Sequence, residues 1–448
     1  MHADIAAPVG ASDDYLFGRG QAWFAYLMTI ALMVCDYIDR QVVASMFPFL
    51  KEEWLLTDAQ LGALVSIVSV IVAVFGIPVA WIADRFSRVK SIVAMALTWS
   101  LATVACMFTQ SYLHLLIARG LVGLGEAGYG SVGAAMVATH FPGRTRSRVL
   151  GGFFASASVG SVLGVVLGGV IAVHFGWRAG FGIVGLPGLA VALLYLLVRD
   201  YETVAAAPAA VSTPGETRGP TQRAMIASIV RSSTVRWVCI GAAAQLIALS
   251  ALWSWLPSYL NRVHNFPADK AAGATALVVL AGALGSVALG AVADRAGRYR
   301  AGGEFIAVAI LSLLTAVVLI FAFGTGYFGL RLGQGERFGL IVLGGFLATC
   351  TVGPAAGIVI GAVHPGVRST GTAVLSLFQN LFGLAAGPFI AGLLSDAVGL
   401  EAALTLTPIG SFAAALSFLA ARRTVGVMLR EDECARFSKN QKTAGSLS

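Results

Sequence analysis

Long apolar stretches separated by short polar connections run through most of the sequence. Apolar runs of about 20 residues, the length that a helix needs to cross roughly 30 Å of hydrocarbon, recur from Phe24 to Arg422. They fall at approximately 22–49, 59–83, 90–110, 112–139, 146–174, 178–199, 237–262, 270–293, 302–324, 337–363, 367–395 and 400–422. The pattern predicts an all-α membrane protein with twelve transmembrane helices.

Composition agrees with this class of protein. Of the 448 residues, 57% are hydrophobic and only 12% are charged, and the mean hydropathy is +0.82, well outside the range of soluble domains. The first residues contain Asp4, Asp13 and Asp14 and lack the short apolar core and cleavage site of a signal peptide. We therefore expect the first span to remain in the protein.

The net charge of +8 reports membrane topology rather than nucleic-acid binding. Basic residues concentrate after spans 2, 4, 8 and 10, around the central connection and in the tail, whereas the opposite connections hold few. Because basic residues favour the cytoplasmic side, we expect both termini in the cytoplasm and the protein in a bacterial inner membrane. The segment from Asp200 to Arg223, rich in Ala, Pro and Thr, has the composition of a linker.

The two halves of the chain repeat each other. "AWIADRFSRVK" from Ala80 matches "GAVADRAGRYR" from Gly290, with an offset of 294 − 84 = 210 between the aspartates. Pro48 and Pro257 differ by 257 − 48 = 209. "FPGRTRS" and "HPGVRST" pair further on, and their prolines are 365 − 142 = 223 apart. We predict a cytoplasmic tail (1–21), a six-helix bundle (22–199), a cytoplasmic linker (200–236), a second six-helix bundle (237–422) and a cytoplasmic tail (423–448). In such repeats, the substrate site lies near mid-membrane between the halves.

The repeated "D-R-x-x-R" pattern lies where span 2 meets span 3 and where span 8 meets span 9. An acidic group beside basic groups at paired helix ends can bond neighbouring helix termini and hold one side of a transporter closed. We assign gating to Asp84, Arg85, Arg88, Asp294, Arg295 and Arg298. The pattern resembles the signature cytoplasmic loop of the major facilitator superfamily, although the first copy has Ala80 and Ser87 where glycines are usual. The resemblance implies two six-helix bundles related by pseudo-two-fold symmetry.

Five ionisable residues interrupt the apolar spans of the first half. Span 1 carries Asp36, Asp39 and Arg40, and span 4 carries Arg119 and Glu126. An ionisable group at mid-membrane costs about 3 kcal/mol even on a lenient scale, so these side chains must face protein or water. In the second half, the counterpart of span 4, "GLIVLGGFLATCTVGPAAGIVIGAV", carries no charge. This asymmetry favours chemistry over the alternative, a static ion-pair network.

Burial predicts a role for each of these residues. A low-dielectric cavity favours the neutral form of a carboxylic acid, so Asp39 and Glu126 are the predicted proton-coupling residues. An arginine stays charged, and we expect Arg40 and Arg119 to engage an anionic substrate or the deprotonated acids. Asp36 lies one helical turn from Arg40 and is predicted to form a structural ion pair with it.

The second half offers aromatic and amide side chains for a cavity wall that suits an amphipathic substrate. The candidate substrate-binding residues are Gln245, Trp253 and Tyr259 in span 7, and Gln379 and Asn380 in span 11. For the aromatic residues, an interfacial belt is an equally good reading.

Three segments narrow the resemblance further. "YIDRQVVASMFP", "ARGLVGLGEAGYG" and "QNLFGLAAGPFIAGLLSD" are similar to the Spinster branch of the superfamily. The resemblance implies proton-linked, rocker-switch movement of a lipid-like substrate of the sphingosine 1-phosphate or lysophospholipid type. A carrier of small organic anions such as sugar acids, or a multidrug exporter, is the alternative.

Other classes find less support in the sequence. The six histidines lie at predicted span ends or tails without metal-ligand spacing, so we expect no enzyme activity. "GLGEAG" lies inside an apolar helix with no preceding strand, which disfavours a nucleotide site. A simple channel is disfavoured by the repeat and the gating motif. We expect membrane lipids and the substrate as partners, no nucleic acid, no cofactor beyond protons as the coupling ion, and a monomer.

Overall fold

The computed structural model describes residues 15–200, 231–327, 329, 332–363 and 367–424. The described residues form helices and connections without any β-strand. The predicted tails and the predicted linker fall largely outside this part of the chain.

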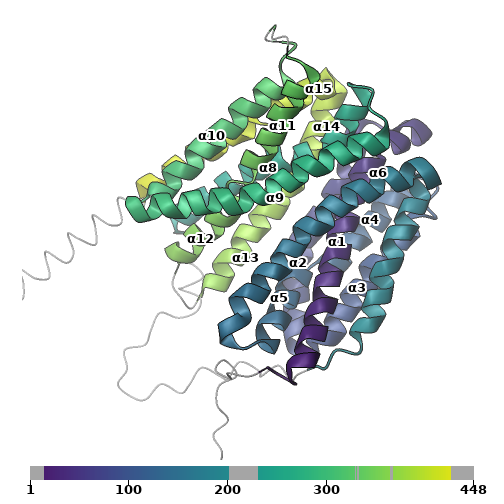
Figure 1. Cartoon of the computed structure of the whole chain (residues 1–448), viewed down its shortest axis with the longest axis vertical. Coiled ribbons are helices and arrows are strands. Elements are labelled where there is room, and N and C mark those ends of the chain that lie inside the picture. The colour runs from purple at the N-terminus through teal and green to yellow at the C-terminus, as the bar shows by residue number, and fades with distance from the viewer. Residues whose placement is uncertain (1–14, 201–230, 328, 330–331, 364–366, 425–448) are drawn as a thin grey trace, which may run out of the picture. The chain divides into compact units, whose positions relative to one another are not determined.

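The first half consists of six labelled helices (Figure 1). They are α1 (Arg19–Trp54), α2 (Asp58–Arg85), α3 (Arg88–Cys106), α4 (Tyr112–Glu126), α5 (Tyr129–His140) and α6 (Gly143–Tyr195). Short caps start several of them. Thr57 forms a capping box with Gln60 at the start of α2, and the Ser87 hydroxyl accepts a hydrogen bond from the Lys90 N–H at the start of α3. Such caps satisfy N–H groups that have no partner inside the helix.

The second half is cut into more pieces. It contains α8 (Ser233–Arg262), α9 (Ala268–Tyr299), α10 (Gly303–Phe323), α11 (Gln334–Ala348), α12 (Val352–Ala362), α13 (Arg368–Phe378), the π-helix η2 (Gln379–Leu384), α14 (Ala386–Val398) and α15 (Leu400–Leu406). A further helical stretch covers 409–424. The predicted span 11 is thus a helix with a π-helical segment at its centre.

The number of membrane-spanning segments agrees with the prediction of twelve. Eleven helical segments in the described part are long and apolar enough to cross a membrane. One of them, α6, is 53 residues long and contains Gly176 in a non-helical conformation (φ 79°, ψ 157°). Gly176 separates the predicted spans 5 and 6, because a residue with this backbone conformation ends one helix and starts another.

Two predicted single helices are broken, and the breaks occupy matching positions of the repeat. Span 4 is interrupted after Glu126, where Gly128 adopts a left-handed conformation (φ 84°). Span 10 is interrupted between α11 and α12, around Cys350. The offset from Ala127 to Cys350 is 350 − 127 = 223, the same as between the paired prolines. The predicted span 4 is confirmed as one membrane-spanning segment, Tyr112–His140. The break inside it was not predicted, because only Gly128 marks it in the sequence.

The chain divides into two compact units. One unit takes in the described part of Met1–Gly215 together with Ser250–Leu280 and Ala385–Ala403, so it includes one end each of α8 and α9 and the whole of α14. The other unit contains the remaining described residues of the second half. These units do not test the predicted bundle boundaries, which remain predictions.

A stripe of glycines, Gly160, Gly164 and Gly168, sets how α6 packs on α1. A Cβ atom added at Gly160, Gly164 or Gly168 would lie 2.6, 2.6 or 2.8 Å from the carbonyl oxygen of Val34, Ile38 or Val42, respectively. The two helices therefore meet backbone to backbone at three successive four-residue steps. Small residues permit this close approach between membrane helices.

Replacement of Gly164 by Ala tests this packing. The added methyl group would collide with the α1 backbone, and overpacking of this kind costs about 1–3 kcal/mol. We expect the melting temperature of the purified protein in detergent to fall. Gly151→Ala is the matched control, because Gly151 lies on the same helix with nothing within 4 Å of an added Cβ, and alanine there should be neutral or stabilising by up to about 1 kcal/mol. Equal melting temperatures for the two variants would contradict the packing role.

Candidate functional site

The five ionisable residues of the first half lie together among the helices of the first unit. Asp36, Asp39 and Arg40 project from α1, and Arg119 and Glu126 project from α4. All except Arg40 are buried, with 3% or less of each residue exposed. The cluster is therefore enclosed by protein rather than facing lipid, as the cost of lipid exposure requires.

Asp39 connects three helices. Its Oδ1 lies 3.3 Å from Nη1 of Arg119 on α4, and its Oδ2 accepts a hydrogen bond of 2.9 Å from the Thr103 hydroxyl on α3. The Arg119 Nε also donates to the Leu64 carbonyl oxygen on α2, at 3.4 Å. Both carboxylate oxygens of Asp39 are therefore bonded, and the pair ties α1, α2, α3 and α4 together.

Arg40 is shared between two carboxylates. Its Nε donates to Oδ1 of Asp36 at 3.1 Å, and its Nη2 lies 2.9 Å from Oε2 of Glu126. The contact with Glu126 lacks hydrogen-bond geometry, and neither Glu126 oxygen accepts a hydrogen bond from the described residues. The guanidinium also lies 5.4 Å from the centre of the Tyr37 ring. About 20% of the Arg40 side chain is exposed, so it is the most accessible charge of the cluster.

The charge balance of the cluster limits what it can do. Three carboxyl groups face two guanidinium groups, so the cluster carries one excess negative charge when every group is ionised. A surrounding of low dielectric disfavours net charge, and one bound proton makes the cluster neutral. The arrangement is thus able to bind one proton and to offer one guanidinium to an anion.

Gln245, one of the candidates in the second half, is fully buried. Its Nε2 donates to the Thr315 hydroxyl at 3.3 Å and to the carbonyl oxygen of Ala348 at 3.2 Å. Ala348 is the last residue of α11. The offset from Asp36 is 245 − 36 = 209, so Gln245 occupies the repeat position that Asp36 occupies in the first half. In this conformation it presents no surface to a ligand.

The aromatic candidates differ in exposure. Trp253 is partly buried, packs against the apolar cluster around Val165 and Ala272, and its Nε1 has no hydrogen-bond partner in the described part of the chain. Tyr259 is fully buried, and its hydroxyl lies 3.1 Å from Nε2 of His264. Tyr259 therefore lies in the protein interior rather than in an interfacial belt, and a role in substrate contact remains a prediction for both residues.

The amides of span 11 lie in the π-helix η2. Asn380 donates from Nδ2 to the Ser376 carbonyl oxygen at 2.9 Å, so its side chain is bonded to its own segment. Gln379 is the first residue of η2 and is partly exposed. A π-helical turn often marks a functional position in a helix. Substrate contact by Gln379 and Asn380 remains a prediction.

The predicted gating residues of the second half lie within a helix. Asp294, Arg295 and Arg298 all belong to α9, which continues to Tyr299, so the second copy of the motif lies within the end of a helix and not in the connection between spans 8 and 9. The turn instead follows at Gly302, which has a φ of 71°. The Arg295 guanidinium donates to the Tyr299 hydroxyl at 3.2 Å.

In the first copy of the motif, α2 ends at Arg85 and α3 begins at Arg88. The side chain of Asp84 lies outside the described part. The Arg85 guanidinium lies 4.0 Å from the Trp81 ring centre. Ser87, which departs from the usual glycine, serves as the N-cap of α3 and so explains the departure.

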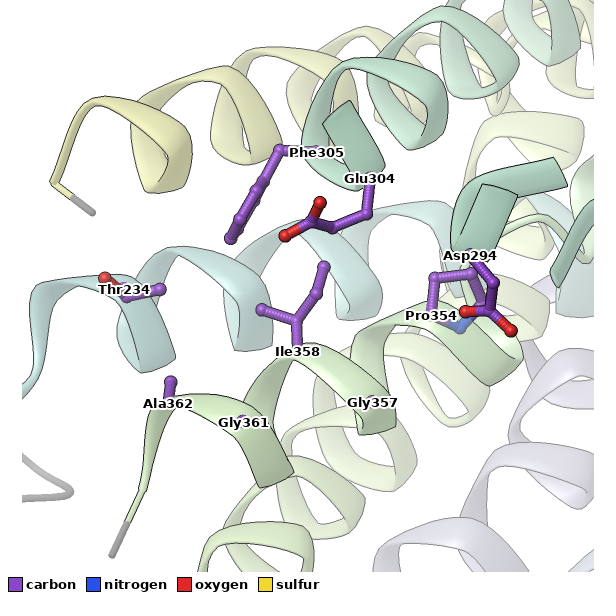
Figure 2. A pocket seen from close by; sticks show the side chains of 9 residues that line it. All are labelled: Thr234, Asp294, Glu304, Phe305, Pro354, Gly357, Ile358, Gly361 and Ala362. Carbon is purple, nitrogen blue, oxygen red and sulfur yellow. The ribbon is translucent and has the colours of Figure 1, made fainter. Parts of the chain in front are cut away.

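A cavity of about 420 Å³ lies in the second unit beside this second motif (Figure 2). It is lined by Thr234, Asp294, Glu304, Phe305, Pro354, Gly357, Ile358, Gly361 and Ala362. Figure 2 shows the Glu304 carboxylate between Phe305 of α10 and Ile358 of α12. The lining includes two acids and no basic residue, so this cavity is unsuited to an anion.

Sequence reasoning missed Thr103. This residue is fully buried and holds the Asp39 carboxylate at the oxygen that Arg119 leaves free. A hydroxyl in an apolar span is a weak signal, because serine and threonine in membrane helices commonly bond their own backbone. Thr103 does this as well, to the Trp99 carbonyl oxygen.

A double-mutant cycle on Asp39 and Arg119 tests the buried pair. Removal of one partner leaves a buried group without its counter-charge, which costs about 3–5 kcal/mol. We therefore expect Asp39→Asn and Arg119→Gln each to lower the melting temperature strongly, and the double variant to lose less than the sum. The exposed pair Glu53 and Arg178, at 2.6 Å with side chains 41% and 39% exposed, is the matched control and should show coupling below about 1 kcal/mol. Additive losses at Asp39 and Arg119 would contradict the pairing.

Comparison with known proteins agrees with the fold. The family model described as Major Facilitator Superfamily matches residues 29–381. An efflux pump of this superfamily from Mycolicibacterium smegmatis is 29% identical over 403 residues, covering 88% of this chain and 90% of the relative. Human spinster homolog 1 is 28% identical over 404 residues, or 85% and 74% of the two chains. The hexuronate transporter of Bacillus subtilis is 27% identical over 266 residues, or 58% and 62%.

A solved structure has the same fold. It is a bacterial homologue of the human lysosomal transporter Spinster, in an inward-facing and unoccupied conformation. The TM-score is 0.77 at 23% sequence identity, and the match covers 91% of this chain and 98% of the other. The chain is similar to Spinster proteins in sequence and fold, and it belongs to the Major Facilitator Superfamily of integral membrane transporters, which are not enzymes.

Proposed function

We propose that the chain is a proton-coupled secondary active transporter of a lipid-like amphipathic substrate with a phosphate group, of the sphingosine 1-phosphate or lysophospholipid type. It works by rocker-switch alternating access, in which two halves tilt around a central site. We place it in a bacterial inner membrane with both termini in the cytoplasm, as a monomer with protons as its coupling ion.

The shared position of Arg40 is the observation that carries this proposal. Arg40 lies between Asp36 and Glu126, and one fifth of its side chain is open to a ligand. A guanidinium matches the geometry of a phosphate or carboxylate group. An anionic head group that binds Arg40 therefore competes with the Glu126 carboxylate for the same cation.

Glu126 is the acid that the contacts favour as the proton carrier. Asp36 and Asp39 each accept a hydrogen bond from an arginine, and Asp39 accepts a second one from Thr103. These bonds stabilise the ionised form. Glu126 has the ion pair with Arg40 but no hydrogen bond within the described residues. Protonation of Glu126 therefore weakens one ion pair and no hydrogen bond, whereas protonation of either aspartate also weakens at least one hydrogen bond.

Coupling follows from the competition at Arg40. When Glu126 is protonated, Arg40 is released from it and is available to the anionic substrate. When Glu126 loses its proton, the carboxylate recaptures Arg40 and displaces the substrate. Proton and anion therefore favour each other's binding, and by linkage the effect is reciprocal. Arg119, held by Asp39 and fully buried, keeps the cluster in place.

A small organic anion, such as a sugar acid, is the second candidate substrate. Similarity to the hexuronate transporter supports it, since a carboxylate also suits Arg40. Two observations favour the lipid-like substrate instead. Human spinster homolog 1 aligns with 85% of this chain, against 58% for the hexuronate transporter. In addition, no arginine besides those of the first half is available to a small anion within residues 237–261, 271–293, 338–363 and 369–395. An exporter of drugs, as the mycobacterial relative's name indicates, is a further alternative.

The pH dependence of substrate binding tests Glu126. In the wild-type protein, protonation of Glu126 removes the competitor for Arg40, so affinity for sphingosine 1-phosphate, a lysophospholipid or galacturonate should rise as pH falls, by up to about tenfold per pH unit. Glu126→Gln should bind the same ligand tightly at all pH values. Ligand-induced thermal stabilisation across a pH series measures this.

Asp39→Asn serves as the comparison variant and should keep the pH dependence. Loss of the pH dependence in Asp39→Asn but not in Glu126→Gln would assign the proton to Asp39 and contradict our choice. The ligand that stabilises the protein is then used in a transport assay driven by a pH gradient in proteoliposomes. In this assay, Glu126→Gln should lose proton-driven uptake but keep counterflow.

Substitution of Arg40 separates substrate recognition from structural support. Arg40→Ala should abolish binding of the anionic ligands at every pH, and Arg40→Lys should retain a reduced part of it, because lysine keeps the charge but loses the planar, bidentate contact. Isothermal titration with the ligand found in the pH series measures the effect. Unchanged affinity in Arg40→Ala would place the head group elsewhere.

A further inference from the structure

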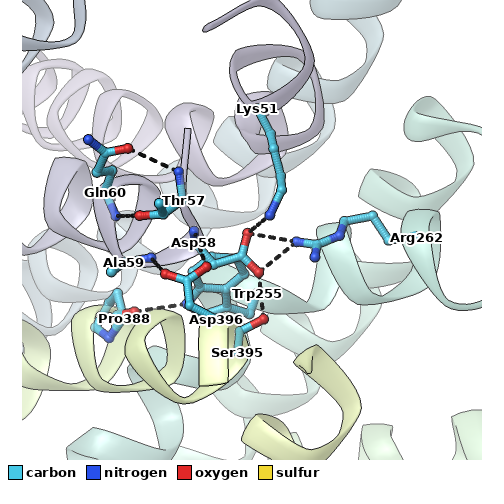
Figure 3. A network of polar contacts seen from close by, with 10 residues as sticks. All are labelled: Lys51, Thr57, Asp58, Ala59, Gln60, Trp255, Arg262, Pro388, Ser395 and Asp396. Atoms are coloured by element: carbon cyan, nitrogen blue, oxygen red, sulfur yellow. Dashed lines mark hydrogen bonds and ion pairs between the residues drawn. The ribbon is translucent and has the colours of Figure 1, made fainter. Parts of the chain in front are cut away.

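Four helix ends of the first unit meet at a second buried carboxylate, that of Asp58. The ends belong to α1, α2, α8 and α14, at the side of the protein that the basic residues predict to face away from the cytoplasm (Figure 3). We call Lys51, Asp58, Arg262, Ser395 and Asp396 the outer gate.

Asp58 is the centre of this group. It is fully buried, and its Oδ1 lies 2.5 Å from the Lys51 ammonium of α1. The Arg262 guanidinium of α8 donates to both carboxylate oxygens, at 2.9 and 3.0 Å, and the Ser395 hydroxyl of α14 donates at 2.5 Å. The Asp58 carboxylate thus binds three different helices, two of which come from the second half of the repeat.

Asp396 makes the reciprocal contact from α14 to α2. Its two carboxylate oxygens accept hydrogen bonds from the backbone N–H groups of Asp58 and Ala59, each at 2.8 Å (Figure 3). These N–H groups belong to the first turn of α2 and have no partner within the helix. A carboxylate at the positive end of a helix is also electrostatically favourable. A residue 338 positions away from Asp58 therefore completes the start of α2.

Below the outer gate, α2 and α14 are in close backbone contact. A Cβ atom added at Gly62 would collide with the Pro388 carbonyl oxygen, and one added at Gly392 would collide with the Asp58 carbonyl oxygen. One turn deeper, the Ser66 hydroxyl donates to the Ala385 carbonyl oxygen at 2.5 Å. The outer gate is therefore the polar end of a tightly closed α2–α14 contact.

The repeat shows that this arrangement is not the default for helix ends on this side. Arg262 matches Lys51 with an offset of 262 − 51 = 211, and Asp269 matches Asp58 with 269 − 58 = 211. Asp269 nevertheless forms no ion pair within the described part of the chain. Its helix, α9, contacts α6 through Ala272 and Gly169, without a charged partner. Of these two matching aspartates, only Asp58 forms ion pairs in the part of the chain that the structure describes.

We propose that Asp58 and Asp396 are the gating residues of the transport cycle on the outer side. Their bonds hold the outer ends of α2 and α14 together, and these bonds must break before the transporter opens outward. Because Asp58 bonds to Lys51 and Arg262 at once, loss of its charge frees both cations and removes the contact from α1 and α8 to α2. This inference rests on membership of the transporter family and not on proton coupling or on the identity of the substrate.

Accessibility of a cysteine at position 66 tests the outer gate. Ser66 is buried against α14, so in a full-length protein lacking the native cysteines, Ser66→Cys should react with a membrane-impermeant maleimide added outside intact cells only while the α2–α14 contact is open. We expect Asp58→Asn to raise the rate of labelling about tenfold, since loss of one partner of a buried ion pair is strongly unfavourable. Asp396→Asn, which keeps every partner of the Asp58 carboxylate, should raise it by a smaller factor.

Asp269→Asn is the matched control, with the same residue type at the equivalent repeat position, and its labelling rate should equal that of the parent. A size-exclusion profile and melting curve of each variant show that it is folded. If Asp58→Asn fails to fold, Arg262→Gln tests the same bonds from α8 and should also raise the rate. Labelling in Asp58→Asn or Arg262→Gln at the rate of Asp269→Asn would overturn the proposal, as would labelling of the parent only from the cytoplasmic side.

Discussion

The charge balance inside the first bundle is the constraint on which the rest of this structure depends. Three acids and two arginines lie within spans that otherwise match hydrocarbon, and each must find its counter-charge among a few neighbouring helices. Asp39 and Arg119 satisfy each other and fix the relative depth of α1 and α4. Arg40 then lies between two acids, Asp36 and Glu126. In our proposal, its ion pair with Glu126 is the one that a ligand or a proton replaces.

The two halves of the repeat share a helix break but differ in the side chains around it. Both halves break their fourth span at the same register, because α5 begins at Tyr129 and α12 at Val352, an offset of 352 − 129 = 223. The second half fills the corresponding positions with neutral groups. The Thr349 hydroxyl donates to the Gly282 carbonyl oxygen, and Gln245 binds the carbonyl end of α11. The backbone geometry is thus shared by both halves, whereas the ionisable groups belong to one.

Much of the fold was predictable, because hydrophobic length and the inner bias of basic residues are strong signals in a membrane protein. The five charges of the cluster stood out for the same reason, since each is costly in lipid. Thr103 and the break at Gly128 were not predictable, because a hydroxyl and a glycine are common in membrane helices. The bonds of Asp58 were missed for another reason. Asp58 follows Thr57 at a helix start, where an acidic residue is ordinary, and only tertiary structure shows that Arg262 and Asp396 meet it.

The glycine stripe on α6 has a consequence for how motion passes through the first bundle. Three glycines of α6 fit against three α1 carbonyl groups at intervals of four residues, so the two helices interdigitate. If α1 slid along α6 by less than about 6 Å, the rise of four residues, larger residues of α6 would meet these carbonyl groups in place of the glycines. Small displacements of α1 along α6 would therefore bring atoms into collision, and we expect the two helices to move together.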